Sequence, residues 1–352
     1  MSKRPWLAPA ILWVVLTGLG LWLVTTFSFY PPRFAHEANV SDDAFQLLLI
    51  LAVPVFAFVI AMMISSLISG KTASEPSEDG PYLPGNQTAV GVWMVITVSL
   101  TILIIINPGL VGLAHMRGSD EADMVVEISG AKWAWTVKYP EQGAIASKEM
   151  VLPVHKRIRF EVTSKDVIHS FWIPGFRIKI DAVPGKTTVT TATPDKTGSY
   201  ETEVGLRLQC AELCGLNHAS MMMPVRVVEE AEFESWIAKT REEASKLPED
   251  CPTLSDNVKI SAFNIAFDTK CLVVPAGKPI KVTFDNKEAI PHNFSIYSDP
   301  EYENSLSKGE IFSGPAERSF TIGPFEAGDD RFQCDLHPIP AMRGFFVVRE
   351  GA

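Results

Sequence analysis

The sequence repeats one order of metal-binding residue types: His, then Cys, then His, then Met. His169 lies 41 residues before Cys210, and His292 lies 42 residues before Cys334. The two sets are His169, Cys210, Cys214, His218 and Met221 in the first copy, and His292, Cys334, His337 and Met342 in the second. Thiolate, imidazole and thioether form a soft ligand set that suits copper better than calcium or magnesium. Two copper centres on one chain indicate electron transfer.

The two copies differ in their number of thiols. The second loop reads Cys-x-x-His-x-x-x-x-Met from Cys334, and with its lone His it supplies the two His, one Cys and weak Met of a blue-copper site. The first loop contains Cys210 and Cys214, four residues apart, so two thiolates can bridge two metal ions. Each ion then has one His, and Met221 is an outer ligand.

Zinc sites and hydrophobic cores also use these residue types. Clusters of Cys and His in intracellular proteins often bind zinc, but zinc gives no role to a Met at fixed spacing in both loops. Met also fills gaps in cores, and Met222 and Met223 directly follow Met221. The spacing selects Met221 as the ligand, while Met222 and Met223 remain alternatives.

Three stretches surround the first copy: Asp166–Pro174, Asp181–Gly185 and Cys210–His218, the last reading Cys-Ala-Glu-Leu-Cys-Gly-Leu-Asn-His. Together they resemble the binuclear CuA domain of cytochrome c oxidase subunit II, from about residue 40 to about residue 240. The resemblance implies two roles for Glu212, whose backbone carbonyl binds copper and whose carboxylate binds a magnesium ion shared with subunit I.

Trp133 and Trp135 alternate in a β-rich stretch, and alternate aromatics are by themselves more typical of a core. The resemblance implies a different role for the first of the pair. In that family this residue lies at the surface over CuA and receives electrons, so we assign the role to Trp133.

The C-terminal hundred residues resemble a cupredoxin through Val274–Gly277, Pro291–Phe294 and Phe332–Pro338. Subunit II otherwise ends before this region, so the domain is a fusion. A fused blue-copper domain tethers an electron donor to its acceptor, which replaces a bimolecular encounter with a high effective concentration.

Three uncharged apolar stretches near residues 6–30, 45–69 and 89–114 are each long enough to span a bilayer as a helix. Lys3 and Arg4 before the first stretch also fit a secretory signal peptide, but no small-x-small cleavage site follows, so we expect a retained helix. The same two charges place the N-terminus in the cytoplasm. Everything after about residue 115 then lies outside a prokaryotic plasma membrane.

Beyond the membrane region, short β-rich segments predict two all-β, cupredoxin-like Greek-key sandwiches. The predicted strands are 124–128, 157–162 and 187–192 in the first, and 258–262, 280–284, 293–297 and 318–322 in the second. Phe233, Trp236 and Ile237 lie at helical spacing, which predicts a helix against the first sandwich. The expected domains are a membrane region 1–118, a CuA domain 119–245, a linker 246–256 and a blue-copper domain 257–352.

Five cysteines divide into three ligands and the pair Cys251 and Cys271. Both lie in the exported part, where oxidising conditions allow a disulfide, and the alternative is two unrelated thiols. The net charge of −10 and the absence of a basic cluster argue against nucleic acid as a partner.

These features predict the electron-input subunit of a respiratory haem–copper terminal oxidase. The expected partners are subunit I, subunit III and an electron donor, which is cytochrome c, a small copper protein or a quinol-oxidising complex. A nitric oxide reductase with a CuA subunit is an alternative, because Val90 stands where the family has a proton-conducting Glu three residues before Trp93. A membrane-anchored copper carrier is the non-enzyme alternative.

Overall fold

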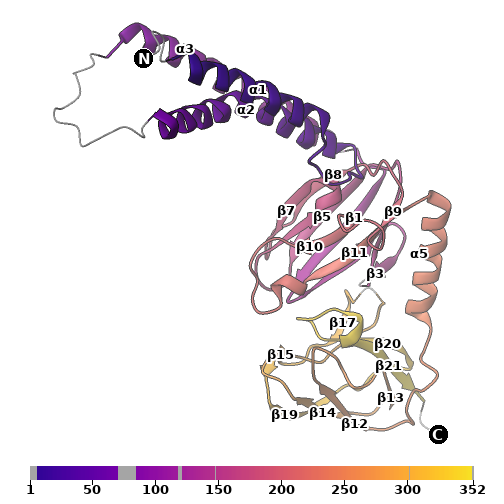
Figure 1. The fold of residues 1–352 in the computed structure, drawn as a ribbon. Helices are drawn as coiled ribbons and strands as arrows, with labels where there is room; N and C mark the ends of the chain where they lie inside the picture. Colours follow the sequence, from indigo (N-terminus) through magenta and orange to yellow (C-terminus); the bar gives the residue numbers. More distant parts are fainter. Residues whose placement is uncertain (1–5, 70–84, 118–120, 147, 301, 351–352) are drawn as a thin grey trace, which may run out of the picture. The chain divides into compact units, whose positions relative to one another are not determined.

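The structure, a computed structural model, describes residues 6–69, 85–117, 121–146, 148–300 and 302–350. The chain divides into two compact units. One contains the N-terminal helices, and the other contains residues 32–36 together with residues 119–352. Figure 1 shows the helices in indigo and purple and the β-rich part from magenta to yellow.

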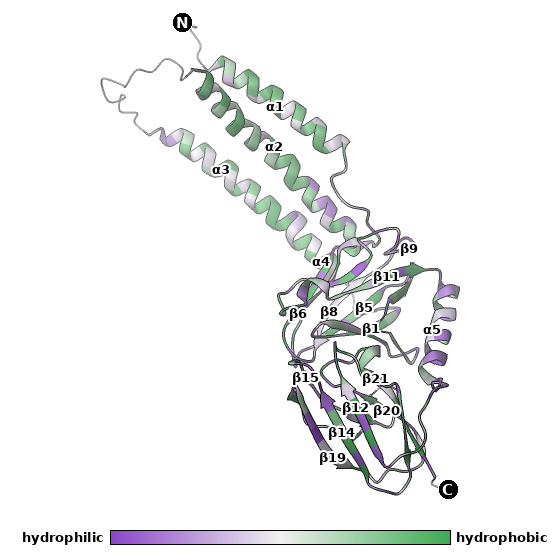
Figure 2. Ribbon diagram, turned by 60° about the horizontal axis from the view of Figure 1, so that its bottom comes forward, coloured by the Kyte–Doolittle hydropathy of each residue, from purple (hydrophilic) through white to green (hydrophobic). Residues whose placement is uncertain are grey.

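The helical unit consists of α1 (Leu7–Thr26), α2 (Glu37–Ser69), α3 (Gln87–Ile104) and α4 (Val111–Arg117). Within the described residues, three helices are long and apolar enough to cross a membrane: Leu7–Thr26, Glu37–Ile68 and Gln87–Ala114. Their apolar side chains are largely exposed in the chain by itself. Figure 2 shows that green, the colour of hydrophobic residues, predominates along these helices. A surface of this kind needs lipid or another protein to cover it.

The second helix begins at Glu37, earlier than the apolar stretch that predicted it. The prediction relied on an uncharged apolar stretch and so left out the acidic residues before it. A carboxylate in the first turn stabilises a helix through the helix dipole, so the helix can begin at Glu37. The third helix is interrupted by a π-helical segment, Ile105–Leu110, in which Asn107 is extended because Pro108 disfavours helical geometry in the preceding residue.

The β-rich unit contains two sandwiches with separate buried cores. The strands of the first are β1 (Met124–Ala131), β2 (Ala134–Tyr139), β3 (Ala144–Ala146), β4 (Met150–Pro153), β5 (Ile158–Ser164), β6 (His169–Ile173), β7 (Ile178–Ala182), β8 (Thr188–Ala192), β9 (Gly198–Ser199), β10 (Arg207–Cys210) and β11 (Met222–Val228). They form one sheet in the order β3-β2-β1-β5-β8 and another in the order β4-β11-β10-β6-β7, with β9 on β11.

The strands of the second sandwich are β12 (Asn257–Ala262), β13 (Cys271–Pro275), β14 (Ile280–Asn286), β15 (Pro291–His292), β16 (Ser295–Tyr297), β17 (Ser305–Ser307), β18 (Phe312–Ser313), β19 (Ala316–Ile322), β20 (Gly328–Gln333) and β21 (Arg343–Arg349). Its sheets run β12-β14-β19 and β13-β21-β20-β16-β17, and β15 pairs with β18. The first sandwich pairs β1 with β5 and β4 with β11 in parallel, and the second does the same with β12 and β14 and with β13 and β21. The two sandwiches therefore share one topology.

All seven predicted strand segments contain a strand, and the predicted helix is confirmed as α5 (Glu230–Ser245). Phe233 and Ile237 are buried against the first sandwich, and the Trp236 indole donates a hydrogen bond to Glu149. Residues 246–256 contain no helix or strand. The predicted domain boundaries stay a prediction.

The connection between α1 and α2 belongs to the β-rich unit. The amide of Phe34 donates to the carbonyl of Gly175, and the amide of His36 donates to that of Thr193, both at 2.9 Å. Residues 32–36 are thus held along the first sandwich.

Candidate metal centres

Neighbouring strands bring together the first ligand set. His169 opens β6 and Cys210 ends β10, and these two strands pair in antiparallel fashion. The loop from β10 to β11 carries the remaining residues of the set. It is closed by a hydrogen bond from the Cys210 amide to the Met221 carbonyl, 3.0 Å long.

Each thiol of the first set has its own histidine. Cys210 Sγ lies 3.8 Å from His169 Nδ1, and Cys214 Sγ lies 3.6 Å from His218 Nδ1. The two sulfur atoms are 3.8 Å apart. All four residues are buried except His218, which is partly exposed.

The other predicted members of this set also lie beside the sulfurs. Met221 Sδ is 3.8 Å from Cys214 Sγ, whereas Met222 is exposed and Met223 packs in the core. The Glu212 backbone carbonyl lies 3.1 Å from Cys210 Sγ, and its side chain is exposed. This geometry fits a carbonyl ligand from Glu212, and its magnesium role stays a prediction.

The two tryptophans occupy different environments. The Trp133 indole donates a hydrogen bond of 3.2 Å to the Cys214 carbonyl and lies against Gly215. Trp135 is 1% exposed, and its ring centroid lies 6.0 Å from that of His169. Trp135 is a core residue, and Trp133 lies partly exposed on the ligand loop.

The second ligand set is built in the same way. His292 lies on β15, Cys334 directly follows β20, and Met342 directly precedes β21. Cys334 Sγ lies 3.7 Å from His292 Nδ1 and 3.6 Å from His337 Nδ1. The Cys334 amide donates to the carbonyl of the buried Met342, as Cys210 does to Met221.

A carboxylate orients the lone histidine in each set, a feature the sequence predictions did not include. His169 Nε2 donates to Asp166 at 2.9 Å, and His292 Nε2 donates to Glu288 at 2.8 Å. Each bond leaves Nδ1 free for a metal, and carboxylates commonly hold the second nitrogen of metal-binding histidines in this way. An acidic residue three or four positions before both histidines was the available signal.

The two sets differ in charge when metal-free. Burial opposes ionisation in the first set, but hydrogen bonds to Asp166 and Cys210 raise the pKa of His169 to about 9. A hydrogen bond to His169 lowers the pKa of Cys210 to about 6 despite burial. Burial and the Cys210 charge raise the pKa of Cys214 to about 12.

In the second set, burial dominates. It lowers the pKa of His337 to about 4, reinforced by the nearby His292, and it raises the pKa of the Cys334 thiol. The second set therefore holds a thiol and neutral imidazoles, whereas the first holds a thiolate–imidazolium pair. Metal binding to either set releases protons.

The donor atoms are spaced for metal binding. Bond lengths of about 2.3 Å to sulfur and about 2.0 Å to nitrogen at tetrahedral angles separate neighbouring donors by about 3.5 Å. The sulfur–nitrogen distances in both sets are 3.6 to 3.8 Å. The thioether in the first set and the Met342 next to Cys334 in the second favour copper over zinc.

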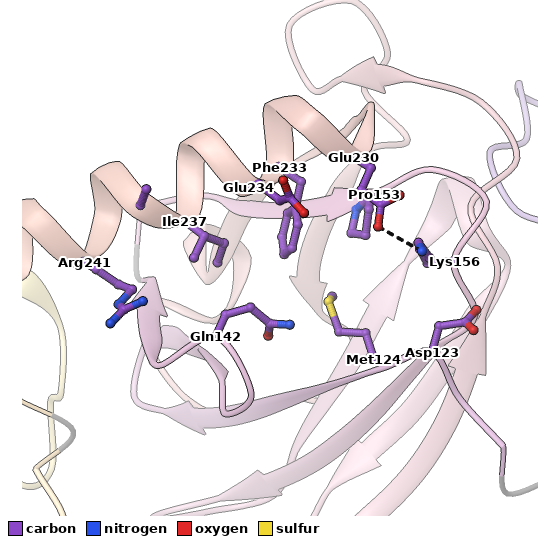
Figure 3. A pocket seen from close by; sticks show the side chains of 11 residues that line it. Asp123, Met124, Gln142, Pro153, Lys156, Glu230, Phe233, Glu234, Ile237 and Arg241 are labelled. Atoms are coloured by element: carbon purple, nitrogen blue, oxygen red, sulfur yellow. Dashed lines mark ion pairs between the residues drawn. The ribbon is translucent and has the colours of Figure 1, made fainter.

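A cavity of about 300 Å³ lies elsewhere, between α5 and strands β1 and β4 (Figure 3). Apolar side chains of Met124, Phe233 and Ile237 line it, and an ion pair of 2.9 Å joins Lys156 to Glu230 at its edge. None of the ligand residues described above lines this cavity. It belongs to the packing of α5.

Cys251 and Cys271 form a disulfide that joins the segment after α5 to the start of β13. The three cysteines of the ligand sets are free. Three of the five cysteines therefore belong to the two ligand sets, and the other two form the disulfide.

Two family models match the β-rich part. Residues 144–229 match the periplasmic domain of cytochrome c oxidase subunit II, and residues 235–348 match a cupredoxin-like domain. The chain is 27% identical to cytochrome c oxidase subunit 2 of Thermostichus vulcanus over 285 residues, which is 65% of this chain and 85% of that protein. It is also 27% identical to a probable cytochrome c oxidase subunit 2 of Rickettsia bellii, with 66% and 94% covered.

Two solved structures are similar to parts of the chain. One is the periplasmic domain of subunit II of the Bradyrhizobium japonicum cytochrome oxidase, which is 37% identical to this chain with a TM-score of 0.33. The similar region covers 35% of this chain and 96% of that domain. The other is reduced auracyanin of Roseiflexus castenholzii, which is 22% identical to this chain with a TM-score of 0.26. The similar region covers 28% of this chain and 99% of auracyanin. The subunit II model and the cupredoxin-like model thus match successive parts of the chain, which over about two thirds of its length is similar to cytochrome c oxidase subunit 2 proteins.

Proposed function

We propose that this chain is the electron-input subunit of a respiratory haem–copper terminal oxidase. In this proposal electrons pass from an external donor to a type 1 copper, then to binuclear CuA, and then to the oxygen-reducing subunit I. The observation that carries the proposal is the pairing in the first set, where each of two thiols 3.8 Å apart faces its own imidazole.

The donor counts support different centres in the two sandwiches. Cys210, Cys214, His169 and His218 would hold a pair of copper ions in the first sandwich, and Met221 and the Glu212 carbonyl would supply further donors. The second set offers a single thiolate with two imidazoles and Met342, which suits one type 1 copper. Copper supplies one-electron chemistry at each site, and the protein fixes the donors.

The orientation follows from the segment between α1 and α2. Because residues 32–36 belong to the β-rich unit, the α1–α2 connection lies on the same side of a membrane as that unit. We propose three crossings with the N-terminus inside, so that both sandwiches would lie on the outer face of a prokaryotic plasma membrane; the three long apolar helices support this proposal. Subunit I and subunit III are the proposed membrane partners, and magnesium bound by Glu212 is proposed between this chain and subunit I.

Copper analysis and spectroscopy of the purified complex test the proposal. We expect three coppers on this chain, a mixed-valence binuclear signal in electron paramagnetic resonance, and a blue band. Replacing Cys214 by Ser should abolish the binuclear signal and leave the blue band, because the two sets share no donor. Zinc at the first set, or exchangeable copper without a mixed-valence signal, would instead indicate a structural site or a copper carrier.

Nitric oxide reduction is the second candidate function, favoured by Val90. This exposed residue of α3 stands where the resembling family has a carboxylate for proton uptake. A complex that consumes nitric oxide and leaves oxygen unreduced would establish this candidate and contradict the oxidase proposal.

A further inference from the structure

In the first sandwich, the outer face of the sheet that contains β2 is shielded from solvent at Thr136. Along β2, Trp135, Val137 and Tyr139 point into the core, so Thr136 and Lys138 point out of the sandwich. A polar residue on an outer face is normally solvated, yet Thr136 is only 9% exposed. The second sandwich, which belongs to the same compact unit, provides the cover.

The contact involves the ligand loop of the second sandwich. Thr136 Oγ1 donates a hydrogen bond of 3.0 Å to the carbonyl of Pro338, the residue after His337. His337 itself is 4% exposed. At the edge of the contact, Lys138 forms an ion pair with Glu303. The His337 loop is thus seated on the β2 face of the first sandwich.

A short series of contacts connects the two ligand sets through this hydrogen bond. Pro338 is bonded covalently to His337, and Thr136 is bonded covalently to Trp135. The Trp135 ring lies against His169, with 6.0 Å between ring centroids. One hydrogen bond and one ring contact therefore separate a ligand of the second set from a ligand of the first.

The remainder of this contact is polar and open. A cavity of about 440 Å³ is lined by outward-facing residues of the first sandwich, among them Glu127, Glu161 and Lys165, and by Tyr302 and Arg343 of the second. Polar contacts between domains of one chain are typical of interfaces that open and close. Within this contact, the bond from Thr136 to Pro338 is a buried hydrogen bond next to the His337 loop.

We propose that Thr136 is the positioning residue that docks the His337 loop on β2 for electron transfer inside the chain. The proposal rests on the proposed function. One electron leaves the reduced second site and reduces the oxidised first site, and no bond is made or broken. Because the Pro338 carbonyl beside His337 bonds to Thr136 and His337 is buried, we expect an external donor to approach the second sandwich at another surface.

The docking is tested first in the metal-free full chain by hydrogen exchange. Loss of a buried neutral hydrogen bond of about 1 kcal/mol raises the opening of the contact about fivefold. In Thr136→Val we expect amides of the His337 loop to exchange about fivefold faster, and Thr136→Ser should restore the original rate. Thr283→Val is the matched control, because Thr283 bonds to Ser319 within its own sheet.

The copper-loaded chain provides the second readout. Thr136→Val should keep the copper content and both spectra, while electron equilibration between the two sites slows and Thr136→Ser restores it. Thr136→Lys places a longer charged side chain on the same outer face and should undock the loop more strongly. Unchanged loop exchange and unchanged electron equilibration in both Thr136→Val and Thr136→Lys would overturn the docking role. Absence of the two copper spectra in the unaltered protein would instead overturn the proposed function.

Discussion

Asp166 and Glu288 have the same task in the two sandwiches, because each accepts the Nε2 proton of the lone histidine. Loss of a carboxylate that holds a metal-binding histidine typically lowers metal affinity by about 10-fold to 100-fold. We expect Glu288→Gln to weaken copper binding at the second set by about 10-fold, since the amide is a poorer acceptor. Competition with a chelator, followed through the blue band, measures this change.

The same variant has an internal control in the first set. Copper bound by Cys210 and Cys214 should keep its affinity in Glu288→Gln, and Asp166→Asn should show the reverse pattern. An equal loss of copper affinity at both sets in either variant would mean that the carboxylate stabilises the overall fold and does not specifically orient its own histidine.

Thiol reactivity distinguishes the two sets in the metal-free protein. The pKa of Cys210 is about 6, so its thiolate forms as the pH rises through that value and predominates at pH 7. The pKa of Cys334 is raised by burial, and that of Cys214 is raised to about 12. Alkylation read by mass spectrometry should therefore modify Cys210 before both others, and earlier modification of Cys334 at pH 7 would contradict this charge state.

At the scale of elements, sequence patterns predicted some of the strands and missed others, among them β6, which carries His169, and β20, which leads to Cys334. Strand β5 alternates buried and exposed residues and was predicted. Strand β6 begins at His169 and is buried on both faces, and β20 begins with Gly328 and two aspartates. Neither strand alternates apolar and polar residues along its whole length, so neither shows the two-residue period from which strands were predicted.

The candidate ligands could be named from residue type and spacing because the first loop carries four of its set and the second carries three within a short stretch of sequence. Asp166, Glu288 and Thr136 were not assigned, for different reasons. The two carboxylates are near their histidines in sequence, but only the strand geometry directs them to Nε2. Thr136 contacts Pro338 across 202 residues, which no local pattern shows.

The disulfide between Cys251 and Cys271 fixes the linker to β13, with a sequence separation of 20. Closing a loop of this length stabilises the folded state by about 3 kcal/mol in the chain-entropy model. Replacing both cysteines by Ala should lower the unfolding free energy of the second sandwich by about that amount. Hydrogen exchange in β12 and β14 measures the loss, and β1 and β5 should be unaffected. Equal protection in both proteins would show that the bridge contributes nothing to stability.

At the scale of the whole molecule, the chain combines a membrane unit with two sandwiches of one topology and two ligand sets of different thiol number. The covalent link between the sandwiches keeps their sites at a high effective concentration, independent of the abundance of a soluble carrier. The second sandwich is therefore the proposed receiver of electrons from outside, and the first is the proposed donor to the oxygen-reducing subunit.

The Cys334→Ser variant of the complete complex tests this order most directly. It removes the thiolate of the second set and leaves every donor of the first in place. Oxygen uptake with the natural donor, supplied in native membranes, should fall by roughly 100-fold, the lower end of the gain from tethering. Oxygen uptake with a small mediator that reduces the first site directly should continue. Undiminished turnover with the natural donor would contradict the account, because electrons would then bypass the second sandwich.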